Sequence, residues 1–304
     1  MTWPRTSPQV PSLPWPSGPP GPDGDEAAKT GARGLGGTYG SVGTYGSDGT
    51  HRAQGGGSDT RSAEAPQRQG WSEQDGQVGI PSRAAWWVLP GLLAGFVLSG
   101  VGAAIGQGLT HRSTSGLTDL LGEAGLWAAF IGTALLVSKR YGTGSLKRDY
   151  GLAVKPVDLL FGVVAAGAAL ILTAVVVAAF QGTKFSGTND QILTQQKGHG
   201  VGLVLVSLLV AIGAPFFEEL FFRGFLRNAL QERFGAHGAV WMQAGLFAML
   251  HFGEASKLAG NVSVVLAMFG VGLVLGYAAR LTGRLGAGMT AHCLFNLLAV
   301  ASVV

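Results

Sequence analysis

Long apolar runs separated by short polar stretches dominate the chain from Ala84 onward, whereas the first 82 residues contain few large apolar side chains. A membrane-spanning helix needs roughly 20 mostly apolar residues to cross a hydrocarbon core of about 30 Å. On this criterion the runs predict about seven membrane-spanning helices, and hence an all-α polytopic membrane helix bundle. Their expected ranges are 84–108, 117–138, 157–180, 201–233, 236–252, 261–280 and 285–304.

Residues 1–82 are rich in Gly, Pro, Ser, Thr and Gln, and they contain a short imperfect repeat at 38–41 and 44–47. Such a segment cannot bury enough apolar surface to offset its chain entropy, so we expect a disordered tail that acts mainly as a spacer. Prolines, rather than an apolar segment, follow the first residues, so no signal peptide is expected. The predicted organisation is therefore a tail at 1–82 and a transmembrane domain at 83–304.

The basic residues between the predicted helices indicate an orientation, because Lys and Arg favour cytoplasmic loops. Those in the loops assigned to the cytoplasm are Lys139, Arg140, Lys147, Arg148, Lys155, Arg233, Arg280 and Arg284. The loops after the third and fifth predicted helices, which are assigned to the other side, contain only Lys184, Lys197 and Lys257. We therefore expect an integral membrane protein with its N-terminus in the cytoplasm and its C-terminus outside. A bacterial-type plasma membrane is the expected location.

One apolar segment, beginning at Val201, contains the charged residues Glu218, Glu219 and Arg223. A charge at the centre of a membrane helix costs about 2.5–3.5 kcal/mol on insertion scales, so such residues mark functional sites. Glu219 and Arg223 share a helix face and are expected to form an ion pair that supports the site. Glu218 points about 100° away from Glu219, so its partner must come from another helix. Pro215 is expected to bend the helix at this level, which suits a cavity.

Three further polar residues lie in later apolar segments: His251, and the pair His292 and Asn296, which are four residues apart on one face. At 1.5 Å of rise per residue, Glu218 and His251 lie about 22 and 21 Å from the predicted cytoplasmic ends of their helices. His292 and Asn296 lie about 12 and 18 Å from theirs. All four depths fall within the membrane, so we expect these residues to form one site.

Three motifs follow one another on hydrophobic segments: Glu-Glu-x-x-x-Arg at 218–223, Phe-x-x-x-His at 247–251 and His-x-x-x-Asn at 292–296. In this order and setting they resemble the family of CAAX prenyl proteases and bacteriocin-processing enzymes, also called the Abi family of intramembrane proteases. The resemblance covers roughly 155–304 and includes the stretch 281–285 before the last motif. Each motif alone is weak evidence, whereas all three in order are specific.

The resemblance implies an endopeptidase that hydrolyses a peptide bond in or beside the membrane. Glu218 would act as the general base that activates a water molecule, and His251 would share or orient that water. His292 and Asn296 would donate hydrogen bonds to the developing oxyanion. Relatives act on prenylated CAAX proteins or in bacteriocin maturation and self-immunity, which leaves the substrate of this chain open.

Other readings of the same residues stay open. A non-catalytic membrane scaffold or immunity protein could keep the pocket for structure, although it has no evident need for an unpaired Glu218. A proton-relay transporter would be expected to show an internal repeat of broken helices, and none is evident. A zinc-dependent form of the protease would use Glu218, His251 and His292 as metal ligands. Because the sequence lacks His-Glu-x-x-His, we favour the form without a cofactor.

The remaining polar features change this picture little. A formal net charge of +4, spread along the tail and loops, does not predict nucleic-acid binding. The expected partners are the lipid bilayer and a peptide or protein substrate. Cys293 and Phe247 are expected to pack in the apolar interior. Asp119 and Glu123, near the start of the second predicted helix, are expected to lie at the membrane interface.

Overall fold

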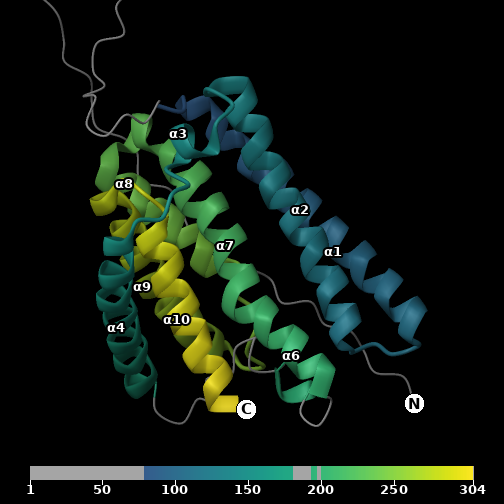
Figure 1. Cartoon of the computed structure of the whole chain (residues 1–304). Helices are drawn as coiled ribbons and strands as arrows, with labels where there is room; N and C mark the ends of the chain where they lie inside the picture. Colours follow the sequence, from purple (N-terminus) through teal and green to yellow (C-terminus); the bar gives the residue numbers. More distant parts are fainter. Residues whose placement is uncertain (1–78, 181–192, 197–199, 304) are drawn as a thin grey trace, which may run out of the picture. The chain divides into compact units, whose positions relative to one another are not determined.

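The computed structural model describes residues 79–180, 193–196 and 200–303. The predicted disordered tail thus lies almost wholly outside the described residues. Within the described ranges the chain forms helices and no β-strand, and the long helices lie side by side in a bundle (Figure 1). Ile80, just before the first helix, is already buried in the core.

The first half of the described chain forms the 3₁₀-helix η1 (Ser82–Trp87), α1 (Val88–Thr110), α2 (Gly116–Tyr141), the short α3 (Leu146–Tyr150) and α4 (Pro156–Ala179). The second half forms α6 (Gly200–Leu208), the π-helical segment η2 (Leu209–Gly213), α7 (Ala214–Glu218), the π-helical segment η3 (Glu219–Leu226), α8 (Arg227–Met249), α9 (Leu258–Thr282) and α10 (Gly286–Val303). The helix boundaries lie within a few residues of those expected from the apolar runs, and the predicted all-α membrane bundle is confirmed.

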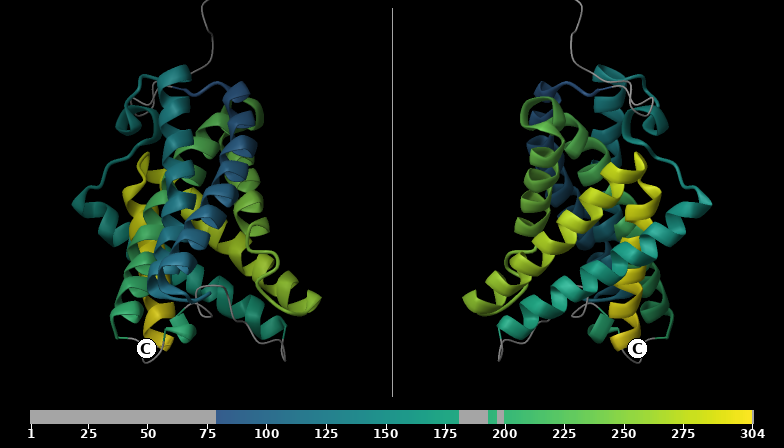
Figure 2. Two further views of the ribbon diagram at one scale, coloured as in Figure 1. Left: turned by 90° about the vertical axis from the view of Figure 1, so that its right-hand side faces the viewer. Right: turned by 90° about the vertical axis from the view of Figure 1, so that its left-hand side faces the viewer.

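Five stretches of the described chain are long and apolar enough to cross a membrane, and the longest of them is Gly200–Met249, with 50 residues. Gly235 breaks this stretch with a positive φ of 69°, a conformation that glycine adopts at little cost. Beyond the break, α8 turns back and runs alongside α9 (Figure 2). The predicted division between 233 and 236 coincides with this break. Because α10 is shorter than the other apolar helices, the count of seven spans stays a prediction.

The α1–α2 hairpin is held together by an unusually close approach of the two backbones. A Cβ atom at Gly102 would lie 2.0 Å from the Leu121 carbonyl oxygen, and one at Gly125 would lie 2.2 Å from that of Leu98. Small residues allow membrane helices to pack at this distance, where dispersion contacts replace the missing hydrophobic drive. The hairpin therefore presents the inner face of α2 to the rest of the bundle as a fixed surface.

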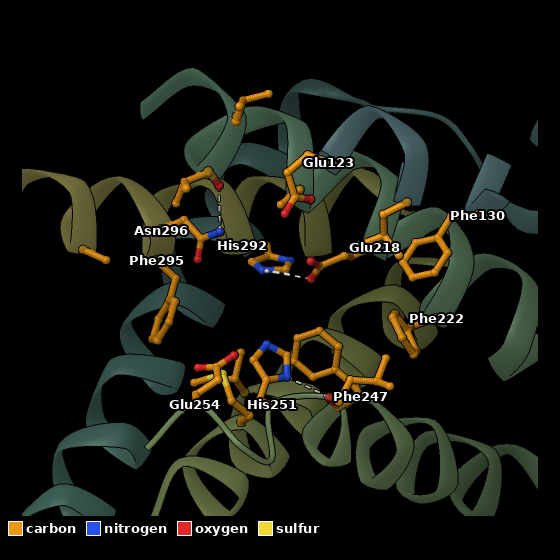
Figure 3. Close-up of a pocket in the computed structure, with 18 of the residues that line it drawn as sticks. Glu123, Phe130, Glu218, Phe222, Phe247, His251, Glu254, His292, Phe295 and Asn296 are labelled. Carbon is orange, nitrogen blue, oxygen red and sulfur yellow. Dashed lines mark hydrogen bonds and ion pairs between the residues drawn. The ribbon is translucent and has the colours of Figure 1, made fainter. Parts of the chain in front are cut away.

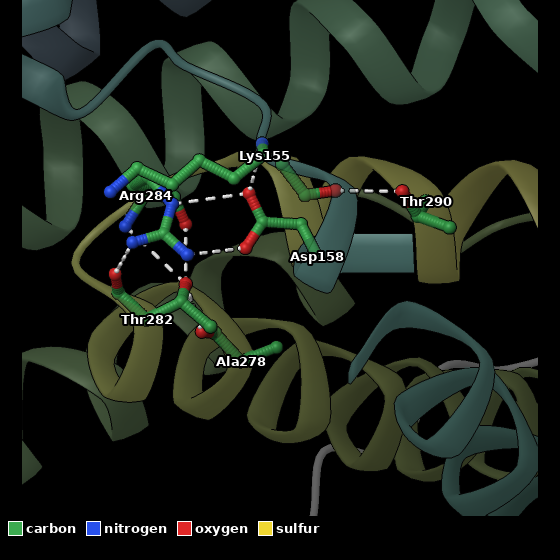
Figure 4. Close-up of polar contacts among 7 residues, drawn as sticks. Lys155, Asp158, Ala278, Thr282, Arg284 and Thr290 are labelled. Atoms are coloured by element: carbon green, nitrogen blue, oxygen red, sulfur yellow. Dashed lines mark hydrogen bonds and ion pairs between the residues drawn. The ribbon is translucent and has the colours of Figure 1, made fainter. Parts of the chain in front are cut away.

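The start of α10 is tied to the start of α4 by the network in Figure 4. Arg284 donates from Nη2 and Nε to the two carboxylate oxygens of Asp158, at 2.6 and 3.1 Å. Asp158 also accepts a hydrogen bond from the Lys155 backbone N–H. A two-point contact between a planar guanidinium and a carboxylate fixes orientation as well as distance. The stretch before the last motif thus determines where α10 enters the bundle.

The basic loops assigned to the cytoplasm gather at one end of the bundle. The short helix α3 and the bend of α8 lie at that end, and the C-terminus lies at the other (Figure 1). Lys155 and Arg284 meet at Asp158 near the same end. The arrangement agrees with the loop grouping expected from the sequence, while the side of the membrane stays a prediction.

Candidate functional site

A cavity of about 250 Å³ lies inside the bundle. Side chains line it from α1, α2, α6, η2, α7, η3, α9, α10 and the end of α8 with the loop that follows. Its lining is mostly apolar, with a small set of titratable groups. These are Asp119, Glu123, Glu218, His251, Glu254 and His292 (Figure 3). Asn296 also reaches the cavity. The structure therefore brings together the four residues that the sequence placed at similar depths in the membrane.

The two adjacent glutamates have different surroundings. Glu218 ends α7 and faces the cavity with its side chain 21% exposed, whereas Glu219 begins η3 and is fully buried. The Oε1 atom of Glu219 lies 3.1 Å from Nη1 of Arg223, which is the expected ion pair. The Arg223 guanidinium lies over the Phe247 ring, 4.3 Å from its centroid. Glu219 is therefore engaged in a buried ion pair with Arg223, whereas the carboxylate of Glu218 is accessible from the cavity.

His292 lies between the two carboxylates. Its Nδ1 atom is 3.2 Å from Oε1 of Glu219, and its Nε2 atom is 3.8 Å from Oε2 of Glu218. Because an ionised carboxylate only accepts hydrogen bonds, Nδ1 must carry the proton in this contact. Nε2 then faces Glu218 and can accept a proton. Glu219 thus sets both the orientation and the tautomer of His292.

His251 is fixed in a similar way by a backbone group. Its Nδ1 atom lies 2.8 Å from the Phe247 carbonyl oxygen, so Nδ1 donates and Nε2 keeps its lone pair. Its ring packs against the Phe247 ring at a centroid distance of 4.8 Å. Phe247, expected only to pack in the core, therefore contacts His251 through both its ring and its carbonyl, and its ring also meets that of His292 edge-on.

The helix predicted at 236–252 ends three residues earlier in the structure, since α8 ends at Met249. His251 therefore lies in the turn that follows the helix. The chain leaves the helix through Gly253, which has a φ of 104°. Asn261 then accepts hydrogen bonds from the N–H groups of Gly253 and Ala255 and donates to the Ala255 carbonyl. This polar side chain of α9 holds the loop that carries His251.

Asn296 satisfies a backbone group that Pro215 leaves without a partner. In η2 the Ala214 N–H bonds to the Leu209 carbonyl, so the next bond in that register would join residue 215 to the Val210 carbonyl. Pro215 has no N–H to donate. The Nδ2 atom of Asn296 donates to the Val210 oxygen instead, at 2.8 Å. Beside the cavity the helix thus has a π-helical register and a carbonyl bonded by another helix, while the expected bend at Pro215 stays a prediction.

Three carboxylates of the cavity were assigned no chemistry from the sequence. Asp119 and Glu123, expected at the membrane interface, both line the cavity. Glu254, from the loop after α8, lines it as well, and Figure 3 shows Glu123 and Glu254. Along α2 the cavity-lining residues are Asp119, Glu123, Leu126 and Phe130. Their spacing of three to four residues follows one helix face, so the pattern alone could have placed both carboxylates on the inner side of α2.

The donor atoms are of types that metal ions accept, but their placement does not gather them as ligands. Zinc in catalytic sites takes His nitrogen and carboxylate oxygen atoms at about 2.0–2.2 Å. Among the described residues, no three His, Cys, Asp or Glu side chains are grouped so that they could hold one metal ion. In this arrangement Glu218, His251 and His292 do not fit a metal centre.

Comparison with known proteins gives a family match for the part of the chain that contains the three motifs. Residues 200–298 match the family model described as type II CAAX prenyl endopeptidase Rce1-like. The match includes all three motifs and omits the α1–α2 hairpin. No curated protein and no solved structure matches the chain.

Proposed function

We propose that the cavity is the active site of an intramembrane endopeptidase, because residues 200–298 match the Rce1-like family of type II CAAX prenyl endopeptidases. The observation that carries the proposal is the contrast between the two glutamates. Glu219 is buried against Arg223 and His292, whereas Glu218 faces an apolar cavity opposite the Nε2 atom of His292. A carboxylate placed in this way can take a proton from a water molecule held beside it.

The proposed reaction needs one water molecule and no other co-reactant. Glu218 accepts a proton as the water oxygen forms a bond to the carbonyl carbon of the scissile peptide. The carbonyl π electrons move to its oxygen. When the tetrahedral intermediate collapses, the C–N bond breaks and Glu218 returns the proton to the leaving nitrogen. The lone pair of His251 Nε2 accepts a hydrogen bond from the same water and orients it.

The oxyanion that forms during this reaction needs donors that are already in place. Asn296 uses one N–H of its amide for the Val210 carbonyl, and the second N–H of that amide is the donor we assign to the oxyanion. His292 can donate only when Nε2 carries a proton in addition to Nδ1. Glu218, 3.8 Å from Nε2, is the group with which His292 would exchange that proton.

The apolar walls of the cavity suit a substrate that reaches the site from within or beside the membrane. A prenylated C-terminal segment is one such substrate, and a precursor of a secreted peptide is another. The competing proposal, a scaffold or immunity protein, would share the fold and the ion pair but would not cleave peptides.

The test is to look for cleaved peptides by mass spectrometry after purified wild-type protein and its variants act on a library of membrane-associated peptides. We expect products from wild type and none from Glu218→Ala or His251→Ala. Glu232→Gln and His237→Ala are matched controls on α8 outside the cavity lining, and both should cleave like wild type. Wild type that binds peptides but never cleaves them would favour the scaffold.

A further inference from the structure

Of the four side chains assigned to the proposed reaction, that of His251 comes from a loop and the others come from helices. Glu218 ends α7, and His292 and Asn296 lie within α10. His251 follows the end of α8, where its N–H bonds to the Ala248 carbonyl at 3.1 Å. A side chain on a helix is placed by the packing of the whole helix, whereas one on a loop is held less precisely. The loop therefore needs a support of its own.

The His251 loop, residues 250–257 between α8 and α9, contributes to one wall of the cavity. His251 and Glu254 both reach the cavity from this loop, and they lie across the cavity from Glu218 (Figure 3). Gly253 lies between them in the chain, and its φ of 104° turns the backbone. Whatever fixes the backbone at 253–255 therefore also limits the movement of His251 toward or away from Glu218.

The side chain of Asn261 provides that support through three hydrogen bonds. Its Oδ1 atom accepts from the N–H groups of Gly253 and Ala255, at 2.8 and 3.0 Å. Its Nδ2 atom donates to the Ala255 carbonyl at 2.7 Å. Only one orientation of the amide satisfies all three bonds, because the oxygen only accepts and the nitrogen only donates. The bonds hold the backbone on both sides of Glu254, beginning two residues after His251.

A packing contact holds the loop against the same part of α9. A Cβ atom at Gly260 would lie 2.8 Å from that of Ala255, so the loop rests directly on the first turn of α9. Asn261 is only 8% exposed, so its bonds to the loop are shielded from competing polar groups. The helix α9 packs in turn against α10, which carries His292. Asn261 thus links the position of His251 to the helices that carry the rest of the site.

We propose that Asn261 is a positioning residue, which keeps His251 at the distance from Glu218 that the reaction needs. Asn261 lies outside the cavity lining, so it acts through the loop. The expected effect on turnover rests on the proposed endopeptidase function. Because a displacement of about 1 Å at a reacting group can cost about 10²-fold in rate, a loosened loop should slow the chemical step. The apolar cavity walls stay in place, so peptide binding should change little.

The first test compares turnover and peptide binding in Asn261→Ala, Asn261→Asp and the control Ser263→Ala. Ser263 is a matched control because it is 1% exposed on the same helix and its hydroxyl has no hydrogen-bond partner among the described residues. We expect Asn261→Ala to lower kcat by about 10–100-fold while Kd stays within about three-fold of wild type. Asn261→Asp keeps the acceptor for both N–H groups and should recover part of the turnover. Ser263→Ala should cleave like wild type.

The second test observes His251 without relying on cleavage. In protein labelled with ¹⁵N-histidine, the Nδ1 proton that His251 donates to the Phe247 carbonyl gives an NMR signal. Its absence in His251→Ala identifies that signal. Asn261→Ala should shift or broaden it and leave the signals of His292 unchanged, whereas Ser263→Ala should change neither. Thermal melting shows whether each variant is folded, and Asn261→Asp takes the place of Asn261→Ala if the latter is not.

The outcomes separate this proposal from the proposed function. An unchanged His251 signal in a folded Asn261→Ala protein would overturn the positioning role, as would unchanged turnover. Equal losses in kcat and in binding, with altered signals from His292 as well, would also overturn it, because they indicate a general loss of structure. A change confined to the His251 signal, in a protein that never cleaves peptides, would support the positioning role and overturn the endopeptidase.

Discussion

Glu218 and Glu219 are adjacent in the sequence, yet removing the charge of each should have opposite consequences. Glu219 is fully buried and contacts both Arg223 and His292, at 3.1 and 3.2 Å. Glu219→Gln leaves the buried Arg223 without its counter-charge. Stranding one partner of a buried ion pair costs about 3–5 kcal/mol. With a shift of about 2–4 °C per kcal/mol for a domain of this size, the melting temperature should fall by about 6–20 °C.

Glu218→Gln should leave the melting temperature nearly unchanged. The side chain of Glu218 is 21% exposed to the cavity, and His292 Nε2 is 3.8 Å away, too far for a strong hydrogen bond. The substitution keeps the size of the side chain and strands no charge, but it removes the general base. Turnover should therefore fall by at least about 10²–10⁴-fold, the usual contribution of a positioned base.

A double variant separates two effects of removing Glu219: the unpaired charge of Arg223, and the lost contact that orients His292. Glu219→Gln combined with Arg223→Met removes both charges of the pair, and the flexible thioether can still pack against Phe247. It should recover part of the lost melting temperature. Activity should not return, because the carboxylate of Glu219 that accepts from His292 Nδ1 and orients the ring is gone.

The assay is thermal melting in detergent together with turnover of one cleaved peptide, for wild type and the three variants. The reasoning fails if Glu218→Gln lowers the melting temperature as much as Glu219→Gln while still cleaving the peptide. It also fails if the double variant is less stable than Glu219→Gln alone.

Three further outcomes are expected. A reporter fused after Val304 should read as extracytoplasmic and one inserted at Lys147 as cytoplasmic; the same side for both would mean that the number of spans is wrong by one. Deleting residues 2–78, which leaves the buried Ile80 in place, should keep turnover at saturating substrate within about ten-fold of wild type. Ten-fold corresponds to a change of about 1.4 kcal/mol in the activation free energy. Exhaustive chelation should leave turnover intact, with no stoichiometric zinc by elemental analysis, whereas loss that Zn²⁺ restores would make Glu218, His251 and His292 metal ligands.

The apolar runs alone determined the fold class and most helix boundaries. The reason is that a bilayer leaves the backbone few choices, since every N–H and C=O in hydrocarbon must bond within the chain. The Glu219–Arg223 pair could also be predicted, because both residues belong to one helix and their spacing brings them together. The depth of Glu218, His251, His292 and Asn296 followed from counting residues along each helix.

The sequence could not show which groups from different helices would meet. The contact of Glu219 with His292 joins η3 to α10, and the contact of Asn296 with Val210 joins α10 to η2. The two residues of each pair lie on different helices, so their spacing in the sequence does not indicate a contact. Whether they meet depends on how the two helices are rotated and shifted against each other. For the same reason the sequence did not predict that Glu123 lines the cavity. Its distance from the helix start could be counted, but only the packing of α2 against the other helices turns its carboxylate into the cavity.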